Sequence, residues 1–297
     1  MKNKRKLWVT LGLLFVALIW GSGFIATQIA IDEGLSPTFI MFVRFTMASV
    51  ILGTTFRKDI KKMKPRDLKM GIIAGGFLFS GFMLQTIGLV FTTPSSNAFI
   101  TATNVVMVPF FSWLAFKERP VAKAFVAAFV CLSGIGMLAF SSGGGLKLGT
   151  GDIFTLFCAV AFALHTVSMG KFSPKMNSNI LTFLQITTSA VFSFIMFMLV
   201  DRDFAAFTSV KGLLAVLYLA VFSTCVAYSI QTVCQKFASP SKVAILISTE
   251  ALVGSILSVI LGFEPFTYFL FIGGIAIIIS MLIIEIDFVS PLRSSVD

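Results

Sequence analysis

The sequence predicts an all-α polytopic membrane protein whose ten transmembrane helices form two inverted five-helix repeats. Three observations support this prediction. Only 12% of the 297 residues are charged and 57% are hydrophobic, with a mean hydropathy of +0.97, whereas a soluble domain has about 25% charged residues. Apolar runs of membrane-spanning length recur between short polar breaks, and the second half of the chain repeats polar residues of the first. This composition excludes a globular enzyme, a secreted disulfide scaffold and a disordered regulator.

The apolar runs predict ten helices, because crossing a bilayer core takes about 20 consecutive, mostly apolar helical residues. The basic start followed by an apolar run resembles a signal peptide. This run continues to about residue 31, so an uncleaved first helix is expected. The helices are expected at residues 8–31, 37–56, 69–91, 94–116, 120–141, 153–171, 179–200, 211–234, 240–262 and 267–286.

The basic residues orient the chain, because cytoplasmic loops of membrane proteins carry an excess of Lys and Arg. With a cytoplasmic N-terminus, that side collects nineteen Lys and Arg residues and the opposite side three. Both termini are therefore expected in the cytoplasm, with 287–297 as a tail, and the membrane is expected to be a plasma membrane of bacterial type. The same bias explains the net charge of +10, so no nucleic-acid partner is expected.

The sequence offers no group of residues for metal, cofactor or catalytic chemistry. The four cysteines lie inside apolar runs without metal-binding spacing. His165 is the only histidine, which removes zinc clusters and Ser-His-Asp chemistry. The glycines between 143 and 151 lack the Lys-Ser/Thr of a phosphate loop and are expected in a linker at 142–152. We therefore predict no metal site, no cofactor and no enzyme.

An internal repeat relates the two halves of the chain. A shift of 146 residues pairs polar positions, namely Gln85 with Gln231, Thr103 with Thr249, Asn104 with Glu250, and Glu118 with Glu264. The shift spans five helices, an odd number, so the halves at 8–141 and 153–286 must have opposite orientations in the membrane. Inverted repeats are the usual construction of secondary transporters, because the halves can exchange conformations and open one side after the other.

Short motifs also follow one another in a characteristic order between residues 8 and 286: Trp20-Gly21-Ser22, Arg44-Phe45, Lys117-Glu118-Arg119, Thr249-Glu250 and Glu264-Pro265. In these motifs the chain resembles the EamA-type branch of the drug/metabolite transporter superfamily, which has two five-helix repeats. The resemblance implies transport without implying one substrate. Ala251 departs from the pattern, in which a proline often follows the glutamate and breaks the helix.

Glu250 is the first candidate site residue, because it is expected near the centre of the ninth helix. A carboxylate at that depth is costly, so such residues usually face a cavity and are functional. Two roles are open, a proton-coupling site and an anchor for a substrate amine. The alternative is a neutral carboxyl that packs helices together, since Gly254 and Ser258 share its face.

Arg44 and a polar stripe are further candidates for substrate binding. Arg44, in the second helix, is placed either to hold a substrate carboxylate as a bidentate fork or to bond carbonyls at the end of a neighbouring helix. Asn97, Thr101 and Asn104 share one face of the fourth helix, which Pro109 is expected to kink. The stripe fits either a cavity wall or interhelical hydrogen bonding.

Mid-helix aromatic and amide residues complete the candidates. Trp20 and His165 occupy matching places in helices 1 and 6. Trp20 fits either a cavity lining for an apolar or aromatic substrate group or plain packing. His165 fits either a proton relay or a core histidine. Gln85 and Gln231 each precede a turn with Ser or Thr followed by Pro, a pattern typical of the start of a helix. The turns are therefore expected to be structural, while either glutamine fits the cavity wall. Two loop anchors are expected, Glu118 and Glu264.

The predicted function is a secondary transporter that moves a small organic metabolite by alternating access, in the export direction. One acid and one arginine at depth favour an amino acid or related zwitterion, since a phosphate ester would need clustered Lys or Arg. Without an ATP-binding motif, the energy must come from protons, an exchanged solute or the substrate gradient. The expected partners are the substrate and the lipid bilayer.

Several alternatives remain open at this point. One is a carrier of sugars, nucleosides or lipids, another is an intramembrane enzyme, and a third is a non-transporting scaffold. Both a monomer and a homodimer are compatible with the sequence. Gly71, Gly75 and Gly76 fit either a dimer contact or a close crossing within the chain.

Overall fold

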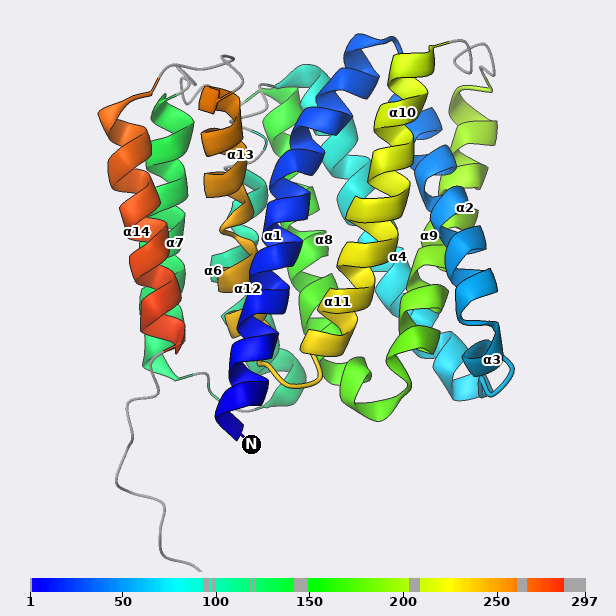
Figure 1. The fold of residues 1–297 in the computed structure, drawn as a ribbon, viewed down its shortest axis with the longest axis horizontal. Coiled ribbons are helices and arrows are strands. Elements are labelled where there is room, and N and C mark those ends of the chain that lie inside the picture. Colours follow the sequence, from blue (N-terminus) through cyan, green and yellow to red (C-terminus); the bar gives the residue numbers. More distant parts are fainter. Residues whose placement is uncertain are drawn as a thin grey trace, which may run out of the picture.

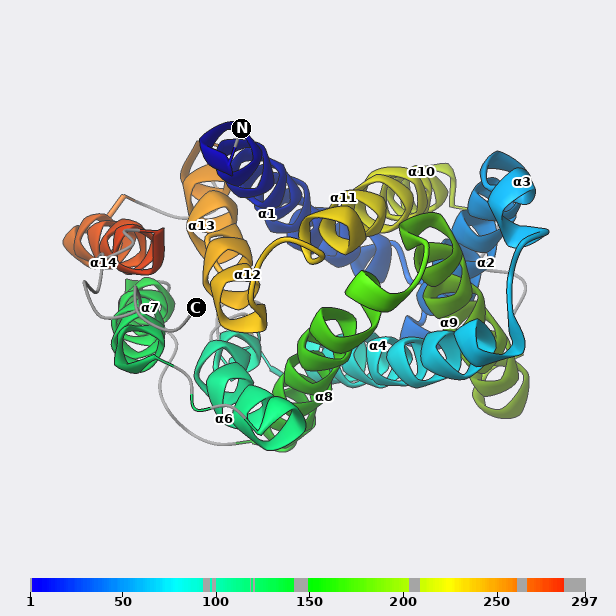
Figure 2. The same ribbon diagram turned by 90° about the horizontal axis from the view of Figure 1, so that it is seen from below.

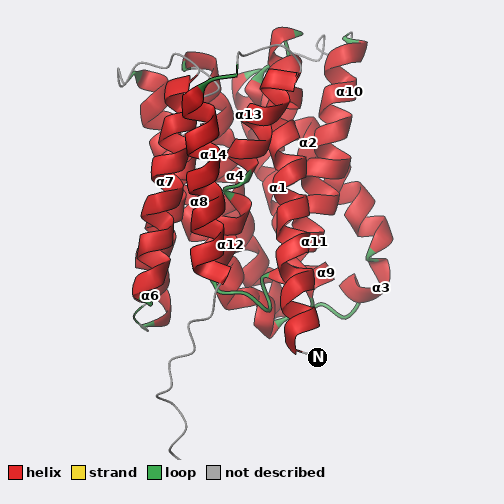
Figure 3. Ribbon diagram, turned by 60° about the vertical axis from the view of Figure 1, so that its left-hand side comes forward, coloured by secondary structure: helices red, strands yellow, loops and turns green. Residues whose placement is uncertain are grey.

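The computed structural model describes residues 2–92, 97, 100–117, 119, 121–141, 149–202, 209–260 and 266–285. Within these residues the regular structure is helical throughout, and Figure 3 draws no strand among them. Seven helices are long and apolar enough to cross a membrane, and three shorter apolar helices lie at Ile100–Phe116, Ala122–Met137 and Tyr268–Ile284. The helices run side by side in one bundle (Figure 1). The prediction of an all-α polytopic membrane protein is confirmed.

The helices of the first half follow the predicted spans, with shifted ends. They are α1 (Lys2–Asp32), α2 (Pro37–Thr55), the short α3 (Arg57–Ile60), α4 (Pro65–Phe91), α6 (Asn104–Phe116) and α7 (Ala122–Ser141). α4 begins four residues before the expected position. The reason is local: Pro65 occupies the first turn, and the Asp67 carboxylate accepts a hydrogen bond from the Lys64 N–H at 2.9 Å, a capping arrangement that hydropathy does not detect.

The second half contains α8 (Thr150–Phe172), η1 (Ser173–Lys175), α9 (Ser178–Val200), α10 (Val210–Tyr218), η3 (Leu219–Val226), α11 (Ala227–Cys234), α12 (Pro240–Ile247), α13 (Glu250–Ile260) and α14 (Tyr268–Glu285). α10, η3 and α11 form one continuous span, and η3 is a π-helix. The predicted helix start at Ser239 and Pro240 is confirmed, because the Ser239 hydroxyl caps α12 by accepting from the Lys242 N–H at 3.3 Å. Its counterpart at Thr93 and Pro94 lies outside the described residues.

Two predicted spans are interrupted at equivalent places in the repeat. The span expected at 94–116 breaks at Thr103, and the span expected at 240–262 breaks at Ser248 and Thr249. In both halves a threonine hydroxyl bonds the carbonyl three residues earlier, Thr103 at 2.6 Å and Thr249 at 2.7 Å. Such local bonds compete with the helical pattern, so a break forms although residue 251 is alanine. α6 includes Pro109, and the interruption lies six residues before that proline.

Close helix crossings hold the bundle together. α4 packs against α8 and α9, and α7 against α14, as Figure 2 shows from below. A Cβ on Gly71 would lie 2.3 Å from Leu184 Cβ, and one on Gly75 would lie 2.5 Å from Thr188 Cβ. Both glycines therefore serve the α4–α9 crossing within the chain. Gly76 has only the Phe192 ring within contact range, at 3.8 Å.

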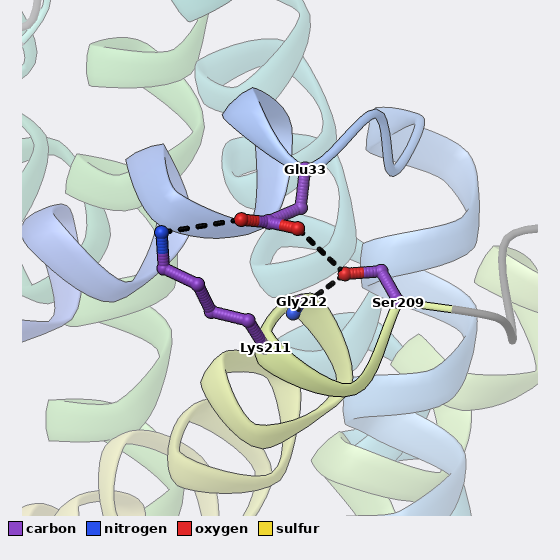
Figure 4. Close-up of polar contacts among 4 residues, drawn as sticks. All are labelled: Glu33, Ser209, Lys211 and Gly212. Carbon is purple, nitrogen blue, oxygen red and sulfur yellow. Dashed lines mark hydrogen bonds and ion pairs between the residues drawn. The ribbon is translucent and has the colours of Figure 1, made fainter.

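At the end of the bundle opposite the N-terminus, polar contacts join α1 to α10 (Figure 4). The Glu33 carboxylate accepts a hydrogen bond from the Ser209 hydroxyl at 2.9 Å and lies 3.1 Å from the Lys211 ammonium. The Ser209 hydroxyl in turn accepts from the Gly212 N–H at 3.1 Å. The Ser209 hydrogen bond, followed by that from Lys211, holds the pKa of the Glu33 carboxyl below its ordinary value.

Candidate substrate cavity

A cavity of about 940 Å³, including its mouth, lies between helices of both halves. Its wall contains residues of α1, α2 and α4 from the first half and of α8, η3 and α11 from the second, together with the residues around both helix breaks. The structure brings to this wall all eight residues that the sequence singles out for substrate binding or proton coupling: Trp20, Arg44, Gln85, Thr101, Asn104, His165, Gln231 and Glu250.

Arg44 is buried in the wall, with 2% of its surface exposed. Its Nε donates to the Thr224 hydroxyl at 2.7 Å and its Nη2 to the Ser223 hydroxyl at 3.1 Å. The guanidinium also lies over the Phe82 ring, 4.3 Å from the ring centroid, a favourable cation–π arrangement. The carbonyl contacts considered above do not occur among the described residues, and no carboxylate there pairs with Arg44. Its remaining N–H groups are available to an anion in the cavity.

Trp20 and Arg44 are held by the same turn of the π-helical segment η3. The indole Nε1 of Trp20 donates to the Ser223 backbone carbonyl at 2.8 Å, while the Ser223 and Thr224 hydroxyls hold Arg44. Thr224 is itself fixed by donating to the Leu219 carbonyl, five residues earlier, at 2.8 Å. π-Helical turns are rare and occur often at functional sites. Trp20 therefore has both a packing role and a place in the cavity wall.

Sequence reasoning missed Tyr228, a wall residue of α11 that lies near rings from both repeats. Its ring centroid is 5.0 Å from that of Trp20 and 6.0 Å from that of His165. The repeat contains a signal for it, because a shift of 146 residues pairs Tyr228 with Phe82, another wall residue. Tyr228 lines the same cavity as Arg44 and Glu250, so all three side chains belong to one site.

Glu250 is the first residue of α13, directly after the break in the predicted ninth helix. Among the described residues its carboxyl group has no hydrogen-bond or ion-pair partner, so the packing carboxyl bonded to a neighbour is not observed. The backbone at Glu250 packs closely on α1, because a Cβ on Gly21 would lie 2.7 Å from the Glu250 carbonyl oxygen. Asn104 occupies the equivalent place in the first half, as the first residue of α6.

The first-half wall is a hydrogen-bonded network. The Gln85 amide donates to the Thr101 hydroxyl at 3.2 Å. The Asn97 amide donates to the Gln85 backbone carbonyl at 3.0 Å and to the Thr155 hydroxyl of α8 at 2.9 Å. Cavity lining and interhelical bonding, the two alternatives for this polar stripe, are therefore combined. In the second half, the Oε1 of Gln231 is buried without a donor among the described residues.

His165 is buried and has one polar partner, the Gln185 Oε1, at 2.8 Å from its Nε2. Since this oxygen is an acceptor, Nε2 carries a proton. Sequence reasoning missed Gln185, although it belongs to a polar stripe along α9 at helical spacing: Ser178, Thr182, Gln185, Ser189 and Ser193, all buried. Within the described residues no group of three or more His, Cys, Asp or Glu side chains is placed to hold a metal ion. The expected loop anchors Glu118 and Glu264 lie outside those residues.

Comparison with known proteins gives one consistent result. Residues 7–140 and 149–286 each match the EamA-like transporter family. An uncharacterized transporter of Archaeoglobus fulgidus is 32% identical over 288 residues, covering 95% of this chain and 87% of the relative. YedA, an uncharacterized inner membrane transporter of Escherichia coli, is 27% identical over 266 residues, covering 87% and 83%. One solved crystal structure has the same fold, with a TM-score of 0.79 over 93% of this chain and 96% of that chain, at 17% identity.

Proposed function

Because the chain belongs to the EamA-like transporter family and is a membrane transporter, we propose that it is a secondary transporter of a small zwitterion such as an amino acid. The solute binds in the cavity described above. Its carboxylate meets Arg44 and its amine meets Glu250. The cavity is shared by both halves, as an alternating-access mechanism between inverted repeats requires.

The observation that carries this proposal is the pair of isolated ionisable groups in one cavity wall. Arg44 is bonded only to neutral hydroxyls, and Glu250 has no polar partner among the described residues. Buried charges are costly unless they are paired. A ligand with a negative and a positive end supplies the missing partner to each group, and Tyr228 of the same wall supplies a hydroxyl to the solute.

The same wall disfavours a phosphorylated solute. Arg44 is the sole Lys or Arg among the wall residues in the part of the chain that the structure describes. A phosphate group is usually held by several cationic or backbone donors. The aromatic rings of Trp20, Phe82 and Tyr228 in the wall instead suit an apolar side chain on the transported molecule.

The direction of transport is proposed from the orientation of the chain. We infer cytoplasmic termini in a plasma membrane from the distribution of Lys and Arg; the tail expected at 287–297 lies outside the described residues. The wall residues of α1 and α4 lie in the halves of these helices that are farther from the N-terminal side, at 20–27 and 82–89. We propose that the cavity opens outward in this state, the state from which an exporter releases its solute.

The test is uptake of a labelled amino-acid panel into liposomes that contain the purified protein, with and without an imposed pH gradient. We expect saturable uptake that Glu250→Gln strongly reduces. The matched control is Glu33→Gln, which removes a carboxylate outside the cavity and should leave uptake unchanged. Dependence on the pH gradient would identify Glu250 as the proton-coupling residue, and independence would identify it as the amine anchor alone.

Uptake of a sugar, nucleoside or lipid, but of no amino acid, would refute the proposed substrate class. Equal loss of uptake in Glu250→Gln and Glu33→Gln would show that the effect is not specific to the cavity. Purified variants should give the same elution profile in detergent as the parent, so that loss of folding is separated from loss of binding.

A further inference from the structure

The segment that joins α2 to α4 is a strongly basic surface that plays no part in the cavity. Residues 57–69 contain seven of the 23 Lys and Arg residues of the chain and two acidic residues. We call this segment the basic cap, and its cations are Arg57, Lys58, Lys61, Lys62, Lys64, Arg66 and Lys69. All seven are exposed. The cap lies at one edge of the bundle (Figure 2), and α3 lies at the same end of the bundle as the N-terminus (Figure 1).

Backbone hydrogen bonds give the basic cap a defined shape. The Phe56 carbonyl accepts from the Ile60 N–H at 3.0 Å, which closes the turn of α3, and the Ile60 carbonyl accepts from the Met63 N–H at 3.0 Å. The Lys64 N–H donates to the Asp67 carboxylate at 2.9 Å, at the start of α4. The cations are therefore carried on consecutive turns of a folded backbone between the end of α2 and the start of α4.

The two acidic residues of the basic cap do not neutralise its cations. The Asp59 carboxylate accepts from the side-chain amides of Asn177, at 3.3 Å, and Asn179, at 2.7 Å, where α9 begins. The Asp67 carboxylate is occupied by the Lys64 backbone N–H. Within the described part of the chain, no ion pair joins a cation of the cap to a carboxylate. Like charges this close together repel one another, so an anionic partner would stabilise the cap.

Exposed apolar side chains continue directly from the basic cap along α4. Leu68 and Ile72 are four residues apart, as are Lys69 and Ile73, so each pair shares one face of the helix. Leu68, Ile72 and Ile73 are exposed. Four residues span about 6 Å along a helix axis, which places Lys69 one turn nearer the N-terminal end of the bundle than Ile73. Charge just outside exposed apolar surface matches a phospholipid, whose phosphate lies just outside its acyl chains.

We propose that the basic cap binds anionic phospholipids of the leaflet on the N-terminal side. Their phosphates lie against the cations, and their acyl chains lie against Leu68, Ile72 and Ile73. Clusters of about four to eight Lys and Arg residues directly beside a transmembrane helix attract such lipids. A free phosphate ion or an acidic peptide would meet the charges but not the apolar residues. A role in orienting the chain alone depends only on the number of charges on that side, and so predicts no preference among lipids.

The experiment measures lipid binding to the purified full chain in detergent by native mass spectrometry. Dioleoyl phosphatidylglycerol, which is anionic, is compared with dioleoyl phosphatidylcholine, which has the same acyl chains and no net charge. Two double variants remove two charges each from the basic cap, Lys61→Gln with Lys62→Gln, and Arg66→Gln with Lys69→Gln. The matched control is Lys117→Gln with Lys236→Gln, which removes two charges just beyond the ends of α6 and α11.

Each Lys or Arg near an anionic surface strengthens binding by about fivefold, so each cap variant should bind phosphatidylglycerol about 25-fold more weakly than the parent. Binding of phosphatidylcholine should not change, and the control should bind both lipids as the parent does. Lys61→Arg with Lys62→Arg keeps the charges and should keep the parent's affinity. Phosphatidylglycerol should also raise the midpoint of thermal unfolding more in the parent than in the cap variants, which separates lost binding from lost folding.

Competition identifies the source of the bound phosphate. Inorganic phosphate and glycerol 3-phosphate lack acyl chains, and at the concentration of the lipid they should not displace phosphatidylglycerol. Displacement by either would show a site for a free anion and overturn the proposal. Binding of a polyglutamate peptide in preference to phosphatidylglycerol would overturn it in favour of an acidic protein partner.

Two further results would contradict the proposal. One is equal affinity of the parent for the two lipids, and the other is equal weakening in the cap variants and the control. Either would leave the basic cap a role in orienting the chain alone. The assay contains no transported solute, so its result is independent of the uptake measurements.

Discussion

The glycine of the Trp20-Gly21-Ser22 motif allows α1 to pack directly on the turn that carries Glu250. A Cβ at Gly21 would lie 2.7 Å from the Glu250 carbonyl oxygen and 2.8 Å from Val253 Cβ. The first of these is a backbone atom, which cannot move aside by rotating a side chain. Gly21→Ala must therefore shift α13 against α1, and with it the position of the Glu250 carboxyl in the cavity.

The size of the effect follows from two opposing contributions. Overpacking a tight contact costs about 1–3 kcal/mol, whereas replacing glycine by alanine inside a helix gains up to about 1 kcal/mol. We expect Gly21→Ala to lower the free energy of unfolding by about 1–2 kcal/mol. Gly76→Ala is the matched control, because its nearest neighbour is a Phe192 ring atom at 3.8 Å. It should keep or raise stability.

The assay is reversible unfolding in mixed micelles of increasing SDS content, followed by the fluorescence of the three tryptophans. The two variants are compared with the parent under identical conditions, and their uptake activity is measured in liposomes. We expect Gly21→Ala to lose uptake as well as stability. Equal stability of Gly21→Ala and Gly76→Ala would refute the reasoning, because it would show that α1 and α13 do not approach as closely as described.

Two further predictions concern Arg44 and Glu33. Thr224→Val removes the hydroxyl that accepts from the Arg44 Nε and should lower the free energy of unfolding by about 1.5–3 kcal/mol. Thr224→Ser keeps the hydroxyl, so its free energy of unfolding should remain within about 1 kcal/mol of the parent. Equal losses for the two variants in the same SDS titration would contradict this role of Thr224. The pKa of Glu33 is lowered from 4.5, first by the Ser209 hydrogen bond and then by Lys211. Its contribution to stability is therefore complete above pH 4.5 and is lost as the pH falls through the lowered value. Glu33→Gln should remove this part of the acid dependence of unfolding. Lys211→Gln at neutral pH should leave stability nearly unchanged, since the pair is exposed; a large loss in Lys211→Gln would show that the contact is stronger than its exposure indicates.

Much of the fold was predictable because hydropathy is a local property of the sequence. A run of apolar residues must cross the membrane as a helix, and the expected spans correspond to helices of the described structure. The helix ends shifted where side chains cap them, as at Pro65 and Asp67. The short α3 and the π-helical η3 were not predicted, because nothing in residue type alone distinguishes a π-turn from an α-helix.

The candidate site was predictable to the extent that its residues are unusual inside a membrane. Arg44, His165 and Glu250 stand out in apolar runs, and the repeat adds Asn104 and Gln85. Their placement in one cavity wall depends on helices that are distant in sequence, so only the structure reveals it. Their role in binding stays a prediction until solutes are tested.

The residues that were missed act through partners. Ser223 and Thr224 are ordinary in a membrane helix and matter because η3 directs their hydroxyls to Arg44. Gln185 is recognisable as a site residue only because its Oε1 lies 2.8 Å from the His165 Nε2. The helix breaks likewise depend on side-chain hydroxyls at Thr103 and Thr249. The absence of a proline at position 251 therefore did not indicate whether the helix is interrupted there.

The central claim is that Arg44 and Glu250 bind the two charged ends of one solute. The most direct measurement compares uptake of a transported amino acid, its methyl ester and its deaminated acid by the parent protein, Arg44→Gln and Glu250→Gln. We predict that the parent carries only the zwitterion, and that Arg44→Gln loses its preference for the free carboxylate over the ester. Glu250→Gln should lose its preference for the amine over the deaminated acid. Equal uptake of all three compounds by the parent would contradict the account.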